Sequence, residues 1–146
     1  MTSRRHPAVR QWHLKKRRLL ADRMPRVRSM LKVVLIEEDV AMQALIAEWL
    51  TQAGHRVESS RRAAAVPAVD VDLLIVDLPR LRVADALDVR ARYPGVPVIG
   101  LSAQLARSLP AGSERARSLG VAALLSKPCS ARELLSAVAD AAGSRH

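Results

Sequence analysis

The chain has 146 residues, one cysteine and a net charge of +10, and this length suits one domain with an ordinary core. No run approaches the roughly 20 apolar residues that a membrane span needs. Cys129 is the only cysteine, so an internal disulfide is excluded. Because a signal-peptide pattern is also missing, we expect a cytoplasmic protein in a reducing compartment.

The positive charge is concentrated at one end of the chain. Residues 1–30 contain ten Lys or Arg and one acid, Asp22, whereas residues 31–146 are almost balanced. We therefore predict a basic N-terminal extension over residues 1–30, either disordered or forming a short helix. A nucleic acid or an anionic surface is expected as a partner only through this extension.

From residue 31 to residue 142, apolar runs rich in β-branched residues alternate with helical patterns. The runs predict strands at 31–36, 55–60, 71–77, 96–102 and 121–126. Helical spacing predicts helices at 42–54, 61–66, 84–93, 103–119 and 130–142. Pro110 marks a break in the fourth helix, and Ser130 with Glu133 forms a capping box at the start of the last one.

Five repeats of strand and helix are typical of a parallel sheet that is covered by helices on both faces. Right-handed crossovers leave few ways to order such strands. In these sheets the working site lies beyond the carboxyl ends of the strands. The residues at those ends are therefore the first candidates for function.

Charged and hydroxyl side chains stand at the ends of four predicted strands: Glu37, Glu38 and Asp39, then Asp77, then Ser102, then Lys127. If the first and third strands are neighbours, at least three carboxylates converge. Mg²⁺ commonly binds through one or two carboxylates, waters and a phosphate, and an aspartate can itself accept a phosphoryl group. The pattern thus predicts a site for Mg²⁺ and a phosphoryl group, with an ammonium and a hydroxyl beside them.

Four segments carry a family resemblance: VVLIEED at 33–39, VDLLIVD at 71–77, VPVIGLSA at 96–103 and LLSKP at 124–128. Through them the chain resembles the receiver domain of bacterial two-component response regulators over residues 31–142, with 143–146 as a short tail. The resemblance implies an α/β fold of the flavodoxin-like kind. This is a three-layer sandwich whose five-stranded parallel sheet has the order 2-1-3-4-5.

The resemblance also implies a role for each side chain at the strand ends. It makes Asp77 the phosphoacceptor, Glu37 and Glu38 the acidic pair that binds Mg²⁺, Ser102 the switch hydroxyl and Lys127 the phosphate-contacting lysine. It further implies a cis peptide bond before Pro128.

Three positions depart from the family pattern. Glu38 stands where the family usually has Asp, and Asp39 is an alternative metal ligand if the strand end is read one residue later. The loop after Asp77 is shorter than usual, so the metal-binding carbonyl would come from Pro79, which fixes φ. Leu124 occupies the aromatic switch position.

Two functions follow from these features. The first is a single-domain receiver in a phosphorelay, phosphorylated on Asp77 by a histidine kinase or phosphotransfer protein. No DNA-binding domain follows residue 142, so we expect its output through protein contact on the face of the fourth helix, fifth strand and fifth helix, with a homodimer as a further option. The alternative is a degenerate pseudo-receiver that binds proteins without phosphorylation.

Enzyme classes fit the sequence less well. A phosphatase with an aspartate nucleophile would need a second acid two residues further on, where Pro79 stands. A dinucleotide enzyme would need G-x-G-x-x-G after the first strand, where the chain has EEDVAM. We therefore expect no enzyme activity beyond self-phosphorylation and autodephosphorylation.

Overall fold

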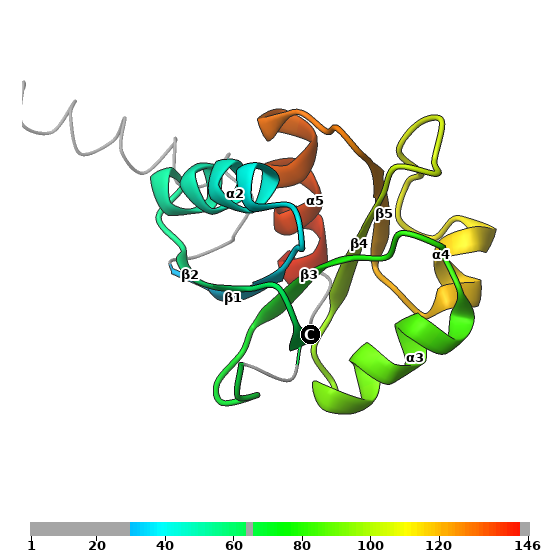
Figure 1. Ribbon diagram of the computed structural model, residues 1–146, viewed down its shortest axis with the longest axis horizontal. Helices are drawn as coiled ribbons and strands as arrows, with labels where there is room; N and C mark the ends of the chain where they lie inside the picture. Colours follow the sequence, from blue (N-terminus) through cyan, green and yellow to red (C-terminus); the bar gives the residue numbers. More distant parts are fainter. Residues whose placement is uncertain (1–29, 64–65, 144–146) are drawn as a thin grey trace, which may run out of the picture.

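The computed structural model describes residues 30–63 and 66–143 (Figure 1). In chain order the elements are β1 (Lys32–Ile36), α2 (Val40–Gln52), β2 (Arg56–Ser60), β3 (Leu73–Asp77), α3 (Val83–Arg92), β4 (Val98–Ser102), α4 (Glu114–Leu119), β5 (Ala123–Ser126) and α5 (Ala131–Gly143). The predictions for residues 1–29 and 144–146 lie outside the described residues.

The five strands form one parallel sheet in the order β2-β1-β3-β4-β5, which confirms the predicted fold class. Every strand ends at the residue that its apolar run predicted. The register pairs Ile36 with Val76, and Ser102 with Ser126. The residues that follow these strands therefore share one rim of the sheet, the carboxyl rim.

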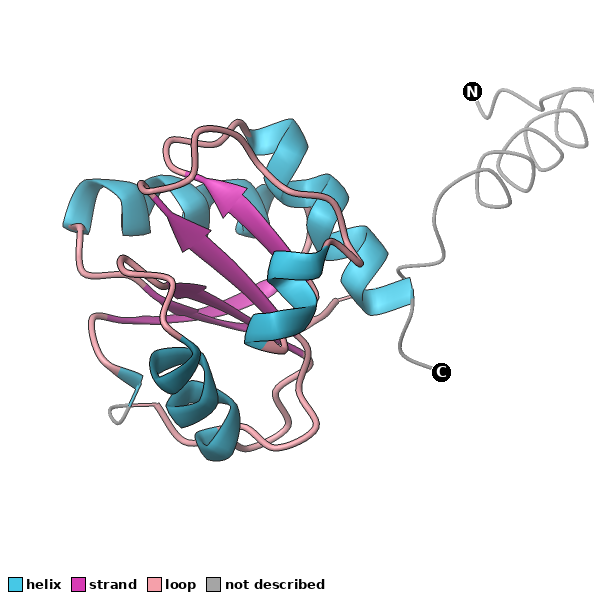
Figure 2. Cartoon of the chain, turned by 90° about the vertical axis from the view of Figure 1, so that its right-hand side faces the viewer, coloured by secondary structure: helices cyan, strands magenta, loops and turns pink. Residues whose placement is uncertain are grey.

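Helices cover both faces of the sheet (Figures 1 and 2). Alternate residues of each strand point to opposite faces, so β1 sends Val33 and Leu35 to one side and Val34 and Ile36 to the other. The first side packs against α2 and α5, and the second packs against α3 and α4. No helix among the described residues is long and apolar enough to cross a membrane.

The predicted helix at 61–66 is correct only in part for the residues that the structure describes there, because Ala63 alone is helical, in a 3₁₀ turn. Arg61 and Arg62 lie in a bend, and residues 64–65 fall outside the described part. Ser60 Oγ accepts a hydrogen bond from Arg62 N at 3.1 Å and donates one to Arg62 O at 2.8 Å. A serine that bonds its neighbouring backbone in this way competes with helix formation.

The predicted helix at 103–119 is correct only for its last turns, because α4 has six residues. Before α4 the chain is irregular, and Pro110 lacks the amide that a helix needs. Leu109 N donates to Leu124 O at 2.8 Å in an antiparallel bridge. This segment therefore covers part of the outer edge of β5, which would otherwise expose unpaired backbone groups.

The start of α5 and the turn before it match the prediction. Ser130 Oγ accepts from Glu133 N at 3.1 Å, and Glu133 Oε1 accepts from Ser130 N at 3.3 Å, which confirms the capping box. The peptide bond between Lys127 and Pro128 is cis, as the family resemblance implied.

Candidate functional site

Three charged side chains from distant parts of the chain meet at the carboxyl rim. Glu37 follows β1, Asp77 ends β3, and Lys127 follows β5. The Lys127 Nζ atom lies 2.5 Å from Glu37 Oε1 and 3.3 Å from Asp77 Oδ1. Because the strands are parallel and in register, their ends deliver these groups to one place. The structure thus confirms that Glu37, Asp77 and Lys127 converge.

Glu37 is the most deeply placed of the three, with no exposed side-chain surface. Apart from the ion pair with Lys127, its Oε1 atom has no hydrogen-bond partner among the described residues. Burial raises the pKa of Glu37, since water solvates a carboxylate better than a protein interior does, and contact with Lys127 partly offsets this effect. Glu37 therefore depends on Lys127 for its compensating charge.

Lys127 remains charged at the rim. Burial disfavours its ammonium, but the contact with Glu37 and the charge of Asp77 outweigh burial and raise the pKa of Lys127. A positive charge is therefore held beside the Asp77 carboxylate.

Asp77 differs from Glu37 in being accessible. Its side chain is 14% exposed and lines an open cavity of about 400 Å³ together with Glu38 and Pro79. The next residue, Leu78, is fixed by a 2.8 Å hydrogen bond from its amide to Leu101 O. An exposed carboxylate on a fixed backbone, with an ammonium beside it, is suited to receive an electrophilic phosphorus.

Ser102 is buried, and its hydroxyl is bonded to backbone groups. It donates to Pro79 O at 3.4 Å and accepts from Gln104 N at 3.1 Å. Its role as a switch hydroxyl stays a prediction. The Pro79 carbonyl keeps a second lone pair for another partner.

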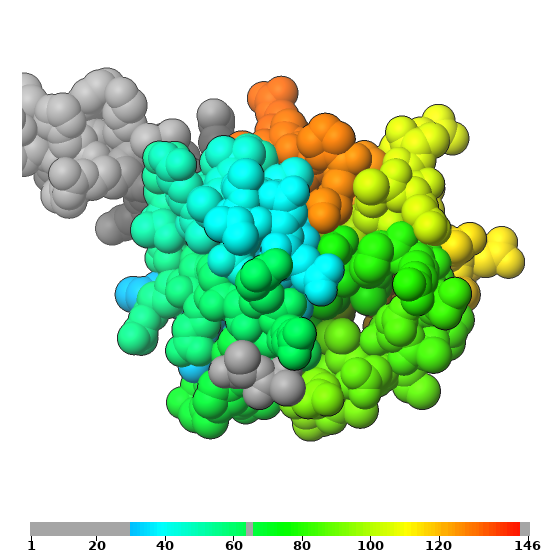
Figure 3. Space-filling view, viewed as in Figure 1, coloured from blue at the N-terminus to red at the C-terminus, as the bar shows by residue number. Residues whose placement is uncertain are grey.

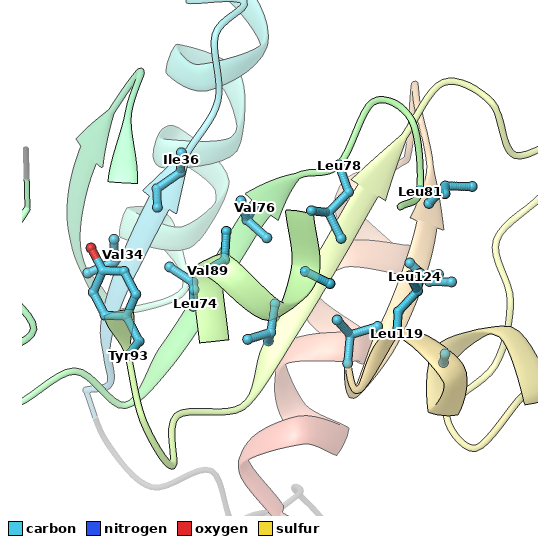
Figure 4. Close-up of a cluster of buried hydrophobic side chains, with 14 of the residues drawn as sticks. Val34, Ile36, Leu74, Val76, Leu78, Leu81, Val89, Tyr93, Leu119 and Leu124 are labelled. Carbon is cyan, nitrogen blue, oxygen red and sulfur yellow. The ribbon is translucent and has the colours of Figure 1, made fainter. Parts of the chain in front are cut away.

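Leu124 is fully buried in the core on the α3 side of the sheet, on the same face as Leu78 and Leu119 (Figure 4). Gly100 of β4 provides the space: a Cβ atom there would lie 2.9 Å from both Leu124 Cδ2 and Leu78 Cδ1. The switch position is thus filled by an aliphatic side chain that packs against its neighbours.

The other predicted metal ligands are more dispersed than the sequence suggested. Asp39 accepts a hydrogen bond from Met42 N at 3.0 Å and caps α2, and Glu38 is exposed. No group of three or more Asp, Glu, His or Cys side chains in the described residues is placed to hold a metal ion. Glu37 and Asp77 do meet at the rim, where both contact Lys127, and the binding of Mg²⁺ by Glu37, Glu38 or Asp39 stays a prediction.

The residues around Asp77 nevertheless include donors of the kind that a divalent cation binds. Mg²⁺ needs only one or two carboxylates when waters and a phosphate complete its shell. Glu38, Asp77 and Pro79 line one cavity and supply two carboxylates and a carbonyl. The chemistry of this donor set suits a hard cation, with Glu37 left to Lys127.

Sequence reasoning missed three arginines in the same cavity, Arg61, Arg62 and Arg80. Its lining combines the end of β1, the residues after β2 and the turn after β3, and the space-filling view shows cyan and green segments adjoining on one face (Figure 3). The available signal was position: an Arg pair directly follows the second strand, and Pro-Arg follows Asp77 by two residues. The pair was instead assigned to a helix.

The chain has the fold of CheY-like response regulator receiver domains. It is similar to the chemotaxis protein CheY4 of Vibrio cholerae, with 20% identity, 77% of this chain and 99% of that chain covered, and a TM-score of 0.61. A CheY-like receiver domain protein of Methanospirillum hungatei matches with 19% identity, 80% and 97% coverage, and a TM-score of 0.64.

A longer protein contains the same fold. NtrX of Brucella abortus, solved in complex with ADP, matches with 21% identity and a TM-score of 0.64 over 80% of this chain, which spans 27% of NtrX. No protein-family model matches the sequence, and no curated protein matches it. The likeness is thus one of fold, and the evidence for function lies in the side chains at the carboxyl rim.

Proposed function

We propose that this protein is a receiver that accepts a phosphoryl group on Asp77 in a phosphorelay. The observation that carries the proposal is the placement of the Lys127 ammonium 3.3 Å from the accessible Asp77 carboxylate. Asp77 also lines an open cavity that a donor can enter, and an ion pair with a purely structural role does not require such a cavity. The receiver fold, in which the strand ends hold the working site, supports the same function.

The chemistry assigns a step to each group. An Asp77 oxygen attacks the phosphorus of the donor and forms an acyl phosphate, while the bond from phosphorus to the donor's leaving atom breaks. The leaving group keeps the electron pair and takes its proton from solvent. Lys127 would then contact the new phosphoryl oxygens, and its contact with Asp77 would be exchanged for one with the phosphate.

Mg²⁺ is the proposed cofactor, held by the carboxylates of Glu38 and Asp77 and the carbonyl of Pro79. When bound, it would neutralise charge on the phosphoryl oxygens. Glu37 has a different task in this proposal: it positions Lys127, because the buried carboxylate holds the ammonium at the rim.

The proposed donor is a histidine kinase or a phosphotransfer protein, and the proposed output is contact with a protein target on α4, β5 and α5. A groove of about 360 Å³ lies on this face, with Leu109, Leu125 and Ala137 among its apolar residues and Glu133 among its acids. Leu109 lies in the irregular segment before α4, where a helix was predicted. This segment therefore forms one wall of the groove.

Acetyl phosphate labelling with Mg²⁺, followed by intact-mass measurement, tests the phosphoacceptor. We expect the wild-type chain to gain one phosphoryl group and Asp77→Asn to gain none. Asp85→Asn is the matched control, because Asp85 lines the same cavity from α3 and should leave the gain unchanged. Equal labelling of wild type and Asp77→Asn, or no labelling of wild type at high donor concentration, would contradict the proposal.

A second candidate is a pseudo-receiver that binds a protein without phosphorylation. The observation that favours it is the buried, aliphatic Leu124 together with a Ser102 hydroxyl that bonds the backbone of Pro79 and Gln104. These groups give the fold no aromatic ring to move when Asp77 changes. Absence of labelling in the experiment above, with partner binding retained in Asp77→Asn, would select this candidate.

A further inference from the structure

The cavity in front of Asp77 is lined by three arginines that the phosphoacceptor chemistry does not use. Arg61 and Arg62 come from the connection after β2, and Arg80 comes from the turn after β3. None of the three forms an ion pair with a carboxylate in the part of the chain that the structure describes. Four carboxylates, those of Glu38, Asp77, Asp85 and Asp88, line the same cavity, and three arginines without an ion pair can bind a ligand with several negative oxygens.

The backbone that carries Arg61 and Arg62 is anchored on both sides. Glu37 N donates to Ser60 O at 3.0 Å, which fastens the end of β2 to the rim. On the other side, the Tyr93 hydroxyl lies 3.1 Å from Ala63 O and 2.9 Å from Val66 O. Its ring is buried next to Val34 on the α3 side of the sheet (Figure 4). The two arginines therefore extend from a fixed turn.

Arg80 is positioned by a turn whose other members are buried or rigid. Leu81 N donates to Leu78 O at 3.2 Å, with Pro79 and Arg80 at the two central positions. Leu81 has φ of +51°, a left-handed conformation that is strained for a residue with a side chain. Burial of the Leu78 and Leu81 side chains in the core holds the turn in that state. The turn thus keeps the backbone of Arg80 in place at the cavity wall.

Two of the four carboxylates that line the cavity have a cationic partner outside the three arginines. Asp77 is paired with Lys127, and Asp88 has Arg92 at 3.8 Å. Glu38 and Asp85 also line the cavity, and Glu38 is the proposed ligand of the cation. A phosphate donor that arrives with its cation carries both charges, and the lining contains carboxylates for the cation and arginines for the phosphate.

We propose that Arg61, Arg62 and Arg80 form an anion subsite that binds the dianionic phosphate of the phosphoryl donor beside Asp77. The subsite rests on the proposed function for its purpose, but its binding step needs neither transfer nor a metal ion. Arginine suits this role because its planar group can make two parallel hydrogen bonds to phosphate oxygens. The subsite makes small phosphate-bearing compounds, and not only a partner protein, ligands of this chain.

Titration with inorganic phosphate, followed by residue-resolved amide NMR, tests the subsite in the full chain. The Asp77→Asn background with EDTA is used, because this variant has no acceptor carboxylate and the buffer has no free divalent cation. We expect saturable shifts at residues 60–63 and 77–81 at constant ionic strength. Changing all three arginines to glutamine should weaken this binding by about tenfold or more, since the charge-assisted hydrogen bonds to the phosphate oxygens are lost.

The control is a second triple variant, with Arg107, Arg115 and Arg117 changed to glutamine. These arginines are also exposed, so the net charge falls by the same amount while the cavity is left intact. A loss confined to the cavity variant supports the subsite. An equal loss in both variants, or no saturable shift at the cavity residues, overturns it.

The two proposals fail in different ways. If phosphate binds in the Asp77→Asn background but wild type is never labelled, the subsite stands and the phosphoacceptor is contradicted. If wild type is labelled but phosphate binding ignores the three arginines, the phosphoacceptor stands and the subsite is overturned. Thermal unfolding of each triple variant verifies that it is folded, as expected for exposed side chains without ion pairs.

Discussion

The two faces of the sheet are covered in different ways. On one face lie α2 and α5, with 13 residues each, and their buried side chains close over the central strands. On the other face lie α3 with ten residues and α4 with six, and the long connections beside them contain irregular backbone. The regular face resembles an ordinary packed core, whereas the irregular face supplies most of the cavity in front of Asp77.

The difference shows where this fold can vary. Regular helices bury apolar surface continuously, so a substitution there costs stability with little effect on the rim. The irregular connections position polar groups instead. Single residues hold their backbone in place, as Tyr93 does through its hydroxyl and Leu81 through its buried side chain. The predictions below test this division between a stabilising face and a site-forming face.

The largest effect is expected at the rim itself. Lys127→Met should destabilise the fold by about 3–5 kcal/mol at neutral pH, because it leaves the buried Glu37 without a counter-charge. The pKa of Glu37 is already raised, so the folded variant binds a proton more readily than the unfolded chain does. Its stability should therefore recover as pH falls from 7 towards 5.

Urea unfolding at both pH values measures this effect. Adding Glu37→Gln to Lys127→Met should restore most of the lost stability, since no buried charge then remains. A loss below about 1 kcal/mol, within the range of a surface ion pair, would show that the Glu37–Lys127 contact matters little.

A pair of leucines compares the two faces directly. Leu134 of α5 is fully buried on the regular face, and Leu134→Ala should cost about 2–5 kcal/mol. Leu109 lies in the irregular segment beside β5 and is half-buried, and Leu109→Ala should cost about 1 kcal/mol. Chemical denaturation of both variants checks the ratio, and equal losses would remove the distinction between the faces.

Tyr93→Phe should have a smaller effect, of about 1 kcal/mol. The ring stays, but the hydroxyl proton that is shared between Ala63 O and Val66 O is lost. Hydrogen exchange should become faster in the connection after β2 and stay unchanged in α2. Uniformly faster exchange would mean that Tyr93 supports the whole core and does not act as a local anchor.

The smallest predicted effect is pH-dependent and lies on the regular face. His55 Nδ1 accepts a hydrogen bond from Leu31 N at 3.3 Å, and burial lowers the pKa of His55. The folded state therefore favours the neutral ring. This contribution to stability is present above pH of about 6.5, the unfolded value, and is lost as pH falls through the folded pKa.

His55→Asn keeps an acceptor without a titrating ring, so the stability difference between wild type and variant should change between pH 7.5 and 5. Measuring the difference removes the opposite slope from Glu37, whose raised pKa stabilises the fold as pH falls. A difference that is constant across this range would contradict the assignment.

Local pattern predicted much of this molecule because the strands are continuous apolar runs that end on charged or polar residues. The polar residues at the ends of these runs identified the candidates Glu37, Asp77, Ser102 and Lys127 from the sequence alone. Helix predictions failed where a side chain bonded nearby backbone, as Ser60 does, or where the chain paired with an edge strand, as Leu109 does. Tertiary contacts of this kind leave no periodic signal.

The cavity arginines illustrate the same limit. Arg61 and Arg80 are 19 positions apart in the sequence, and only the parallel pairing of β1 with β2 and β3 brings their segments to one cavity. The pairing of Glu37 with Lys127 was likewise hidden, since the sequence offered Glu37 as a metal ligand. The sequence predicted that these charged side chains lie close together at the rim. It did not predict which of them form ion pairs.

A crystal structure of the protein grown with Mg²⁺ and beryllium fluoride, a mimic of an aspartyl phosphate, tests the central claim most directly. The expected result is trifluoroberyllate bonded to an Asp77 oxygen, with Lys127 Nζ on a fluorine and the cation on Glu38 and Asp77. An unmodified Asp77 under those conditions, with Lys127 still placed between Glu37 and Asp77, would contradict a phosphoacceptor at this rim.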